Sequence, residues 1–185
     1  KQIFDFLRSD GRIEPLMAGF GAFYESRKEF LAGRYVHADE ETGANKKLIE
    51  MMRPVLKGRY RMRKGIDYIV TPWGDVPLDG SSSGQQEAFP LLISILMYPN
   101  SRKSGDRLII EEPEAHLYPE SQKYVLDLMV ESSVENNCSL LFTTHSPYIL
   151  ACLNVYAAKW AKEHENSELL EAFFVSDGKV ISLID

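Results

Sequence analysis

The chain has 185 residues, of which 44% are hydrophobic and 26% charged, and its formal net charge is −6 at pH 7. This length can bury one core of ordinary size, and the composition is typical of a globular protein rather than a disordered one. No run approaches the ~20 apolar residues of a membrane span, so membrane insertion is not expected. The acidic balance argues against bulk attraction to nucleic acid, and two cysteines, too few for a disulfide framework, favour a reducing cytoplasm.

The first third of the chain predicts helices. Apolar residues with a 3.6-residue period occupy positions 20–31, and a second such stripe occupies positions 48–56. Neither stripe carries residues that point to catalysis. We expect residues 1–58 to form a helical lobe and residues 59–185 to form a second lobe with both strands and helices.

Basic residues crowd into the stretch after the second helix. Arg59, Arg61 and Arg63 alternate with Tyr60 and Met62, which on a strand would place all three arginines on one face. Such a row could follow a nucleic-acid backbone, so DNA is a candidate partner. The solvated face of a half-buried strand is the simpler interpretation. The runs 59–63, 66–71 and 76–78 predict a small antiparallel meander.

A polar segment then precedes an apolar helical run. Residues 86–97 form this run, and Pro90 is expected in its first turn, where proline is tolerated. The segment before it therefore lies at a helix N-terminus, whose free backbone N–H groups can bind an anion. For this segment taken alone, an ordinary serine N-cap with a flexible glycine is the simpler interpretation. These residues are Ser82, Ser83, Gly84 and Gln85.

A short strand ending in two carboxylates follows. Residues 108–110 are apolar and predict a buried strand of a parallel sheet, and Glu111 and Glu112 stand directly after them. Ligands of open α/β sheets bind outside the carboxyl ends of the strands, so chemistry is expected at this pair. A solvated acidic turn is one alternative. A metal-dependent nuclease with Glu111, Glu112, Glu114 and His116 as ligands is another.

A second predicted strand, residues 138–143, leads directly to His145. A helix over residues 119–137 connects the two strands, and Ser146 is expected to cap the helix that follows His145. Near the end of the chain, Asp177-Gly178 between apolar runs predicts a hairpin. His145 is thus expected near the acidic pair.

Taken in this order, residues 78–147 resemble the second half of an ATP-binding cassette (ABC) ATPase, an AAA-type P-loop NTPase, of the SMC, RecF and OLD group. The resemblance implies an α/β fold with parallel core strands, a helical N-terminal region and small antiparallel hairpins. Residues 82–85 stand in the place of the ABC signature, and Glu111-Glu112 in that of the Walker B motif, where most members begin with Asp. By this resemblance Glu111 holds Mg²⁺, Glu112 orients and deprotonates the attacking water, and His145 is the switch histidine at the γ-phosphate.

The resemblance also implies a second subunit. In this family the signature contacts ATP bound on the partner, so a homodimer with two composite ATP sites is expected. The phosphate-binding loop, Gly-x-x-x-x-Gly-Lys-Ser/Thr, is not found in this sequence. We therefore expect the chain to be the C-terminal part of an ATPase whose N-terminal half carries Walker A, and to be inactive alone. The alternative is a degenerate, non-hydrolysing cassette that acts as a nucleic-acid or protein interaction module.

Overall fold

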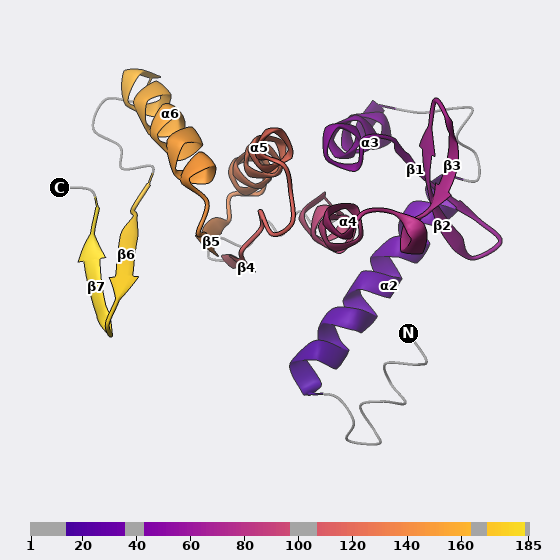
Figure 1. The fold of residues 1–185 in the computed structure, drawn as a ribbon, viewed down its shortest axis with the longest axis horizontal. Helices are drawn as coiled ribbons and strands as arrows, with labels where there is room; N and C mark the ends of the chain where they lie inside the picture. Colours follow the sequence, from indigo (N-terminus) through magenta and orange to yellow (C-terminus); the bar gives the residue numbers. More distant parts are fainter. Residues whose placement is uncertain (1–13, 36–42, 97–106, 164–169, 184–185) are drawn as a thin grey trace. The chain divides into compact units, whose positions relative to one another are not determined.

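The computed structural model describes residues 14–35, 43–96, 107–163 and 170–183, which divide into two compact units, residues 1–145 and 146–185 (Figure 1). The first unit mixes helices with two small sheets, and the second has one helix and one hairpin. In chain order the first unit contains α2 (Pro15–Tyr35), α3 (Gly43–Leu56), β1 (Arg59–Arg63), β2 (Ile66–Thr71), β3 (Gly74–Pro77), the 3₁₀ turn η1 (Leu78–Gly80), α4 (Ser83–Leu96), β4 (Arg107–Glu111), α5 (Pro119–Asn136) and β5 (Ser139–Thr143).

Helix α4 lies at the centre of the core of the first unit. It contacts α2, α3 and α5, and the helices α3, α4 and α5 are seen nearly end-on in Figure 1. Phe89 of α4 is fully buried, with its ring edge-on to Tyr24 of α2 at 6.4 Å and tilted against Tyr60 of β1 at 4.6 Å between centroids. Burying such a side chain stabilises the fold by about 1.5–3 kcal/mol. Packing of its apolar face therefore fixes the position of α4, including that of its first turn.

The start of α4 differs from the sequence prediction. The helix begins at Ser83, three residues before the predicted start, because Ser82 serves as its N-cap. Pro90 consequently lies inside the helix rather than in its first turn, and removes one backbone hydrogen bond there. Met97, the predicted last residue, is outside the described residues.

Strands β1, β2 and β3 form the predicted antiparallel meander, in which Arg61 lies opposite Tyr68. The β1–β2 turn contains Lys64 and Gly65 at φ 51° and 78°, as in a type I′ hairpin turn. Tyr60 points inward and donates a hydrogen bond to Asp67 Oδ1 at 2.8 Å. Because Tyr60 is held inward, its neighbours Arg59 and Arg61 lie on the exposed face of β1.

A polar cluster fastens α2 to this meander. Lys28 Nζ lies 3.1 Å from Glu25 Oε1 and 3.3 Å from Asp67 Oδ2. Burial raises the pKa of Tyr24, and the carboxylates of Asp67 and Glu25 raise it further. Burial alone would lower the pKa of Lys28, but the bonds to Glu25 and Asp67 outweigh it and leave that pKa raised. Tyr24 is therefore neutral and Lys28 charged at neutral pH.

Strands β4 and β5 pair in parallel, with α5 as the crossover between them. The register pairs Arg107 with Ser139 and Glu111 with Thr143, so both strands end at the same edge. Both were expected to be buried strands, yet Ile109 is 66% and Leu141 57% exposed. Within the described residues this sheet has two strands, and its face that carries Ile109 and Leu141 is left largely open.

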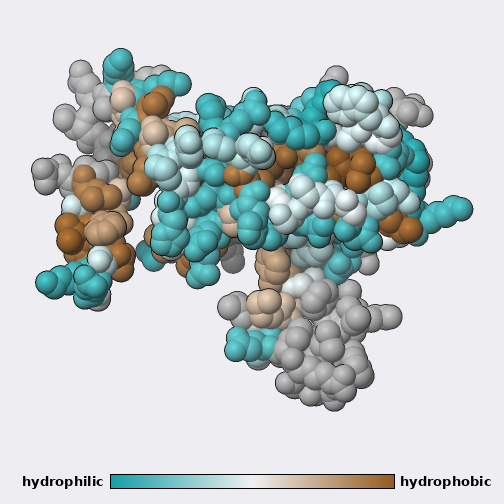
Figure 2. Space-filling view, in the orientation of Figure 1, coloured by the Kyte–Doolittle hydropathy of each residue, from teal (hydrophilic) through white to brown (hydrophobic). Residues whose placement is uncertain are grey.

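The second unit contains α6 (Pro147–Glu163), β6 (Phe173–Ser176) and β7 (Lys179–Ser182). Ser146 Oγ accepts hydrogen bonds from the backbone N–H groups of Tyr148 and Ile149, which confirms its predicted capping role. Asp177-Gly178 forms the turn of the predicted hairpin, whose exposed surface is strongly hydrophobic (Figure 2). No helix within the described ranges combines the length and apolar character required to cross a bilayer.

Candidate functional site

The carboxyl ends of β4 and β5 form the first part of the site. Beyond the paired residues Glu111 and Thr143, the backbone N–H of Glu112 donates to the carbonyl of Thr143 at 3.1 Å and to its hydroxyl at 3.3 Å. The two strand ends are therefore tied together one residue past the sheet. This confirms the expectation that the acidic strand and the strand before His145 end side by side.

Glu112 and His145 face each other at this edge. Glu112 Oε1 lies 3.6 Å from His145 Nε2, and the two side chains are 56% and 88% exposed. The distance is longer than a hydrogen bond, but it leaves both groups able to contact one ligand. Glu112 has φ 42°, a left-handed backbone conformation that directs the chain away from the strand. A carboxylate and an imidazole so placed can orient a water molecule and hold a proton.

Glu111, the last residue of β4, is also exposed. It lines a largely apolar cavity of about 650 Å³ between α2, α4 and β4, together with Phe20, Leu91 and Ile109. Within the described parts of the chain, no hydrogen bond or ion pair joins Glu111 to His145. An exposed carboxylate at the end of a strand has the chemistry that Mg²⁺ prefers, since this ion binds oxygen ligands and keeps several waters.

The start of α4 forms the second part of the site. Gln85 Oε1 accepts from the backbone N–H of Ser82 at 3.1 Å and from its hydroxyl at 2.9 Å, while Gln85 N–H donates to Ser82 Oγ at 3.3 Å. Gln85 Nε2 donates to the carbonyl of Leu56 at 2.6 Å. This is a reciprocal cap, so the N-cap interpretation of the sequence is confirmed. Ser82 and Ser83 are exposed beside the unpaired N–H groups of the first helical turn, and an anion can reach them.

Gly84 is buried because the helix start abuts the turn after β4. A Cβ atom at Gly84 would clash with the carbonyl oxygen of His116 and lie 3.2 Å from its carbonyl carbon. His116 has φ 56°, and its Nδ1 lies 2.7 Å from Glu87 Oε2. Only glycine fits at this position, because residues 82–85 pack directly against the acidic turn.

Glu114 is a site residue whose position the sequence did not predict. Its side chain is only 8% exposed, and Oε1 accepts from Thr144 Oγ1 at 2.5 Å and from His145 N–H at 2.9 Å. Glutamate is rarely buried, and the apolar neighbours Pro113 and Ala115 were the only signal. Because Glu114 binds the β5 loop and His116 binds Glu87, the alternative nuclease ligand set is not brought together. The described residues contain no cluster of three groups that could hold a metal.

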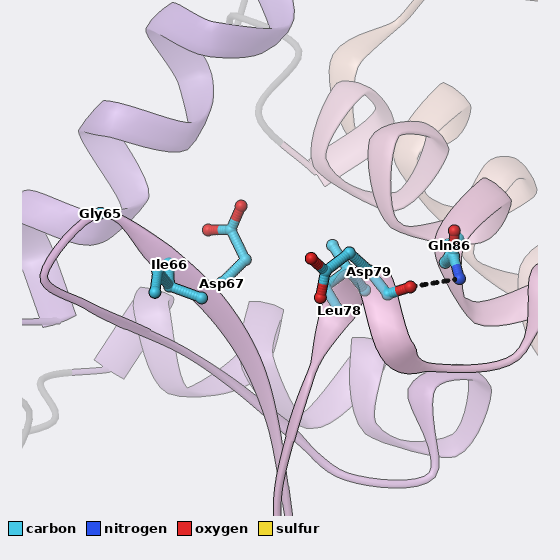
Figure 3. A pocket seen from close by; sticks show the side chains of 6 residues that line it. All are labelled: Gly65, Ile66, Asp67, Leu78, Asp79 and Gln86. Carbon is cyan, nitrogen blue, oxygen red and sulfur yellow. Dashed lines mark hydrogen bonds between the residues drawn. The ribbon is translucent and has the colours of Figure 1, made fainter.

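A second cavity, of about 400 Å³, lies beside α4 (Figure 3). Asp67 and Asp79 approach it from opposite sides, and Gln86 Nε2 donates to the carbonyl of Asp79 at 3.2 Å. None of its lining residues is basic. Carboxylates repel phosphate oxygens, so this cavity does not suit a nucleotide triphosphate.

Comparisons with known proteins identify the family and the fold of the chain. A model of the family described as "AAA domain, putative AbiEii toxin, Type IV TA system" matches residues 7–151. The OLD nuclease of Thermus scotoductus (strain ATCC 700910 / SA-01) is 32% identical over 87 residues, which is 45% of this chain and 16% of that relative. The matched stretch is thus a small part of the relative's length.

Two solved structures have the same fold. One, from work on ATP-driven dimerization and DNA stimulated activation of SMC ATPases, has a TM-score of 0.51 and 16% identity over 76% of this chain and 83% of that chain. The other, the SmcHead bound to the C-winged helix domain of ScpA, has a TM-score of 0.51 and 18% identity over 76% of this chain and 42% of that chain. The predicted α/β fold of a P-loop ATPase is confirmed.

Replacing Gly84 by alanine tests the contact between α4 and the turn. The added methyl group meets rigid backbone, so Gly84→Ala is expected to lower the free energy of unfolding by about 1–3 kcal/mol. Gly80 has open space around its Cβ position, and Gly80→Ala should change it by less than about 0.5 kcal/mol. Urea denaturation followed by circular dichroism measures both. Equal stabilities for the two variants would contradict the close approach.

Proposed function

The chain belongs to this AAA domain family, within the SMC/OLD-like group of ABC-type ATPases, and from that premise we propose that it carries hydrolytic residues of a Mg-ATP-dependent ATPase. The observation that carries the proposal is the approach of Glu112 and His145 at the shared edge of β4 and β5. Both are exposed and follow the ends of two different strands, at the place where α/β sheets bind ligands. Free Cys138 and Cys152 fit the cytoplasmic location that we propose with it.

The proposed roles follow from the chemistry of the side chains. The Glu112 carboxylate accepts a proton from the attacking water and orients it, and the His145 imidazole donates a hydrogen bond to a phosphate oxygen. Glu111 holds the metal ion, directly or through water. Mg²⁺, when bound, neutralises charge on the phosphates. Phosphoryl transfer depends mainly on positioning and charge neutralisation, so these few residues are chemically adequate for this half of the site.

We place the second half of the site on a partner subunit. Ser82 and Ser83 are exposed at the start of a helix, where the backbone favours an anion such as the γ-phosphate. Gly84 and Gln85 fix the position of this helix start: Gly84 packs against His116, and Gln85 donates a hydrogen bond to Leu56. ATP-driven dimerization of the similar SMC ATPases supports a homodimer with two composite sites.

The phosphate-binding loop belongs, in this proposal, to a segment outside these 185 residues. Parallel sheets are normally covered on both faces, yet β4 and β5 expose Ile109 and Leu141, and an apolar cavity opens beside β4. Two paired strands are also fewer than a stable sheet requires. A further strand would extend this sheet at its edge, the helix after it could cover these side chains, and the loop between them would supply the missing phosphate contacts.

The isolated 185-residue chain is expected to bind ATP only weakly and not to hydrolyse it. Its described anion site is one helix start, whereas the α- and β-phosphates need the absent glycine-rich loop. Isothermal titration calorimetry with Mg-ATP measures the affinity. Micromolar binding by the chain alone would show that it holds a complete nucleotide site.

Glu112→Gln tests the proposed base in the full-length protein that carries the phosphate-binding loop. Glutamine preserves size and hydrogen bonding but cannot take a proton, so kcat should fall by at least about 100-fold. The ATP-bound dimer should persist, as measured by light scattering after size-exclusion chromatography. Glu131→Gln, an exposed change on α5, is the control. Normal turnover by Glu112→Gln would remove Glu112 from this role.

A second candidate function is nucleic-acid binding on the meander. Arg59, Arg61 and Arg63 are all exposed on one face of β1, as their alternation predicted. Trp73 at the β2–β3 turn is 90% exposed, and a free indole can stack on a base. Arg63 pairs with Asp75 at 2.6 Å, which reduces the charge of the row. This function would suit a cassette that does not hydrolyse ATP, and it is also compatible with one that does.

Charge reversal tests this surface. The triple variant Arg59→Glu/Arg61→Glu/Arg63→Glu should weaken binding to a short DNA duplex and reduce the salt dependence of log K by about 2–3. Fluorescence anisotropy at several salt concentrations measures both quantities. A charge-matched control changes three exposed lysines to glutamate, Lys159, Lys162 and Lys179. If both triples behave alike, the arginine row has no specific role.

A further inference from the structure

The buried carboxylate of Glu114 is the unusual feature of the acidic turn. The side chain lies between the turn after β4 and the loop after β5, and both bonds of Oε1 go to the β5 loop. Removing a carboxylate from water is costly unless hydrogen bonds compensate. Two donors satisfy Oε1, whereas Oε2 is buried with no hydrogen-bond partner in the part of the chain that the structure describes. A residue kept at such a cost has a task that a smaller or apolar side chain cannot perform.

The two hydrogen bonds of Glu114 Oε1 hold the loop after β5. Thr144 and His145 lie in the loop beyond β5, where sheet pairing no longer fixes the backbone. The bond to the backbone N–H of His145 fixes the point from which the imidazole extends, and the bond to Thr144 fixes the residue before it.

Glu112 is fixed from the same turn. Its N–H bonds to Thr143, and its carbonyl accepts from Ala115 N–H at 3.0 Å, so Glu112 and Glu114 belong to one rigid turn. Glu114 then spans from that turn to the backbone of His145. The 3.6 Å separation between Glu112 and His145 therefore depends on Glu114.

We propose that Glu114 is a positioning residue: its buried carboxylate holds the backbone of His145 so that the imidazole faces Glu112 and the γ-phosphate. The proposal rests on the proposed ATPase function for its effect on turnover, but the bridge itself does not. Glu114 touches neither water nor nucleotide in this role. It acts through His145, as an outer-shell residue that orients a reacting one.

The choice of variants follows from the geometry. Glu114→Ala removes both bonds. Glu114→Gln retains an acceptor oxygen for Thr144 and His145, and should preserve the bridge without the charge. Glu114→Asp is one methylene shorter and should fail to reach the loop. Thr144→Val removes one donor and leaves the His145 bond intact, so it serves as a milder variant if the alanine variant does not fold.

Two measurements test the proposal in the full-length protein. Amide hydrogen exchange at His145, followed by NMR or mass spectrometry, reports the bridge without any need for activity. Exchange should accelerate by at least about 10-fold in Glu114→Ala and Glu114→Asp and stay near wild type in Glu114→Gln. In the ATPase assay, kcat should fall by about 10–100-fold in the alanine and aspartate variants with little change in KM for ATP, and glutamine should rescue it.

Each outcome decides the proposal. Unchanged exchange at His145 in Glu114→Ala would show that the bridge does not exist. Faster exchange with normal kcat would show that the bridge only stabilises the loop, and would overturn the positioning role. Loss of kcat in Glu114→Gln despite normal exchange would also overturn it, since the charge rather than the bridge would then matter. Absence of ATP hydrolysis by the wild-type protein refutes the proposed function and, with it, the effect on turnover, while the exchange measurement still decides the bridge.

Discussion

The parallel pairing of β4 with β5 is the constraint on which the candidate site depends. Because Glu111 is in register with Thr143, the two strands end at one level and their following loops leave the sheet together. A shift by a single residue would turn every side chain of one strand to the opposite face. The crossover helix α5, whose residues Val125, Leu128 and Met129 are buried in the common core, holds this register from one side.

A second constraint links this edge to the start of α4. The apolar face of α4 is anchored by Phe89, and its first turn is held by the reciprocal cap between Ser82 and Gln85. Gly84 allows that turn to approach the backbone of His116. The two groups of candidate nucleotide residues thus belong to one compact unit and touch each other, although nearly thirty positions separate them in the sequence. Movement of either part would therefore displace the other.

Patterns with a short period predicted most of this structure from the sequence. The alternation in β1, the Asp-Gly turn of the final hairpin and the Ser146 cap were all identified because each depends on neighbours along the chain. The side of β4 and β5 that is exposed could not be predicted, because it depends on packing between elements that are far apart in the sequence. The bridge of Glu114 escaped detection because its partners lie about thirty residues away. The early start of α4 was missed because the cap competes with a helix-breaking signal at Pro90.

The backbone conformation of Glu112 lowers the stability of the fold at the position of the proposed base. A residue with a side chain pays roughly 1–2 kcal/mol to adopt a left-handed conformation, which glycine adopts freely. Glycine at this point would relieve the strain, but it would also remove the carboxylate that faces His145. The fold therefore retains a locally unfavourable conformation at the residue that we propose as the base, and selection for thermal stability alone would favour its replacement.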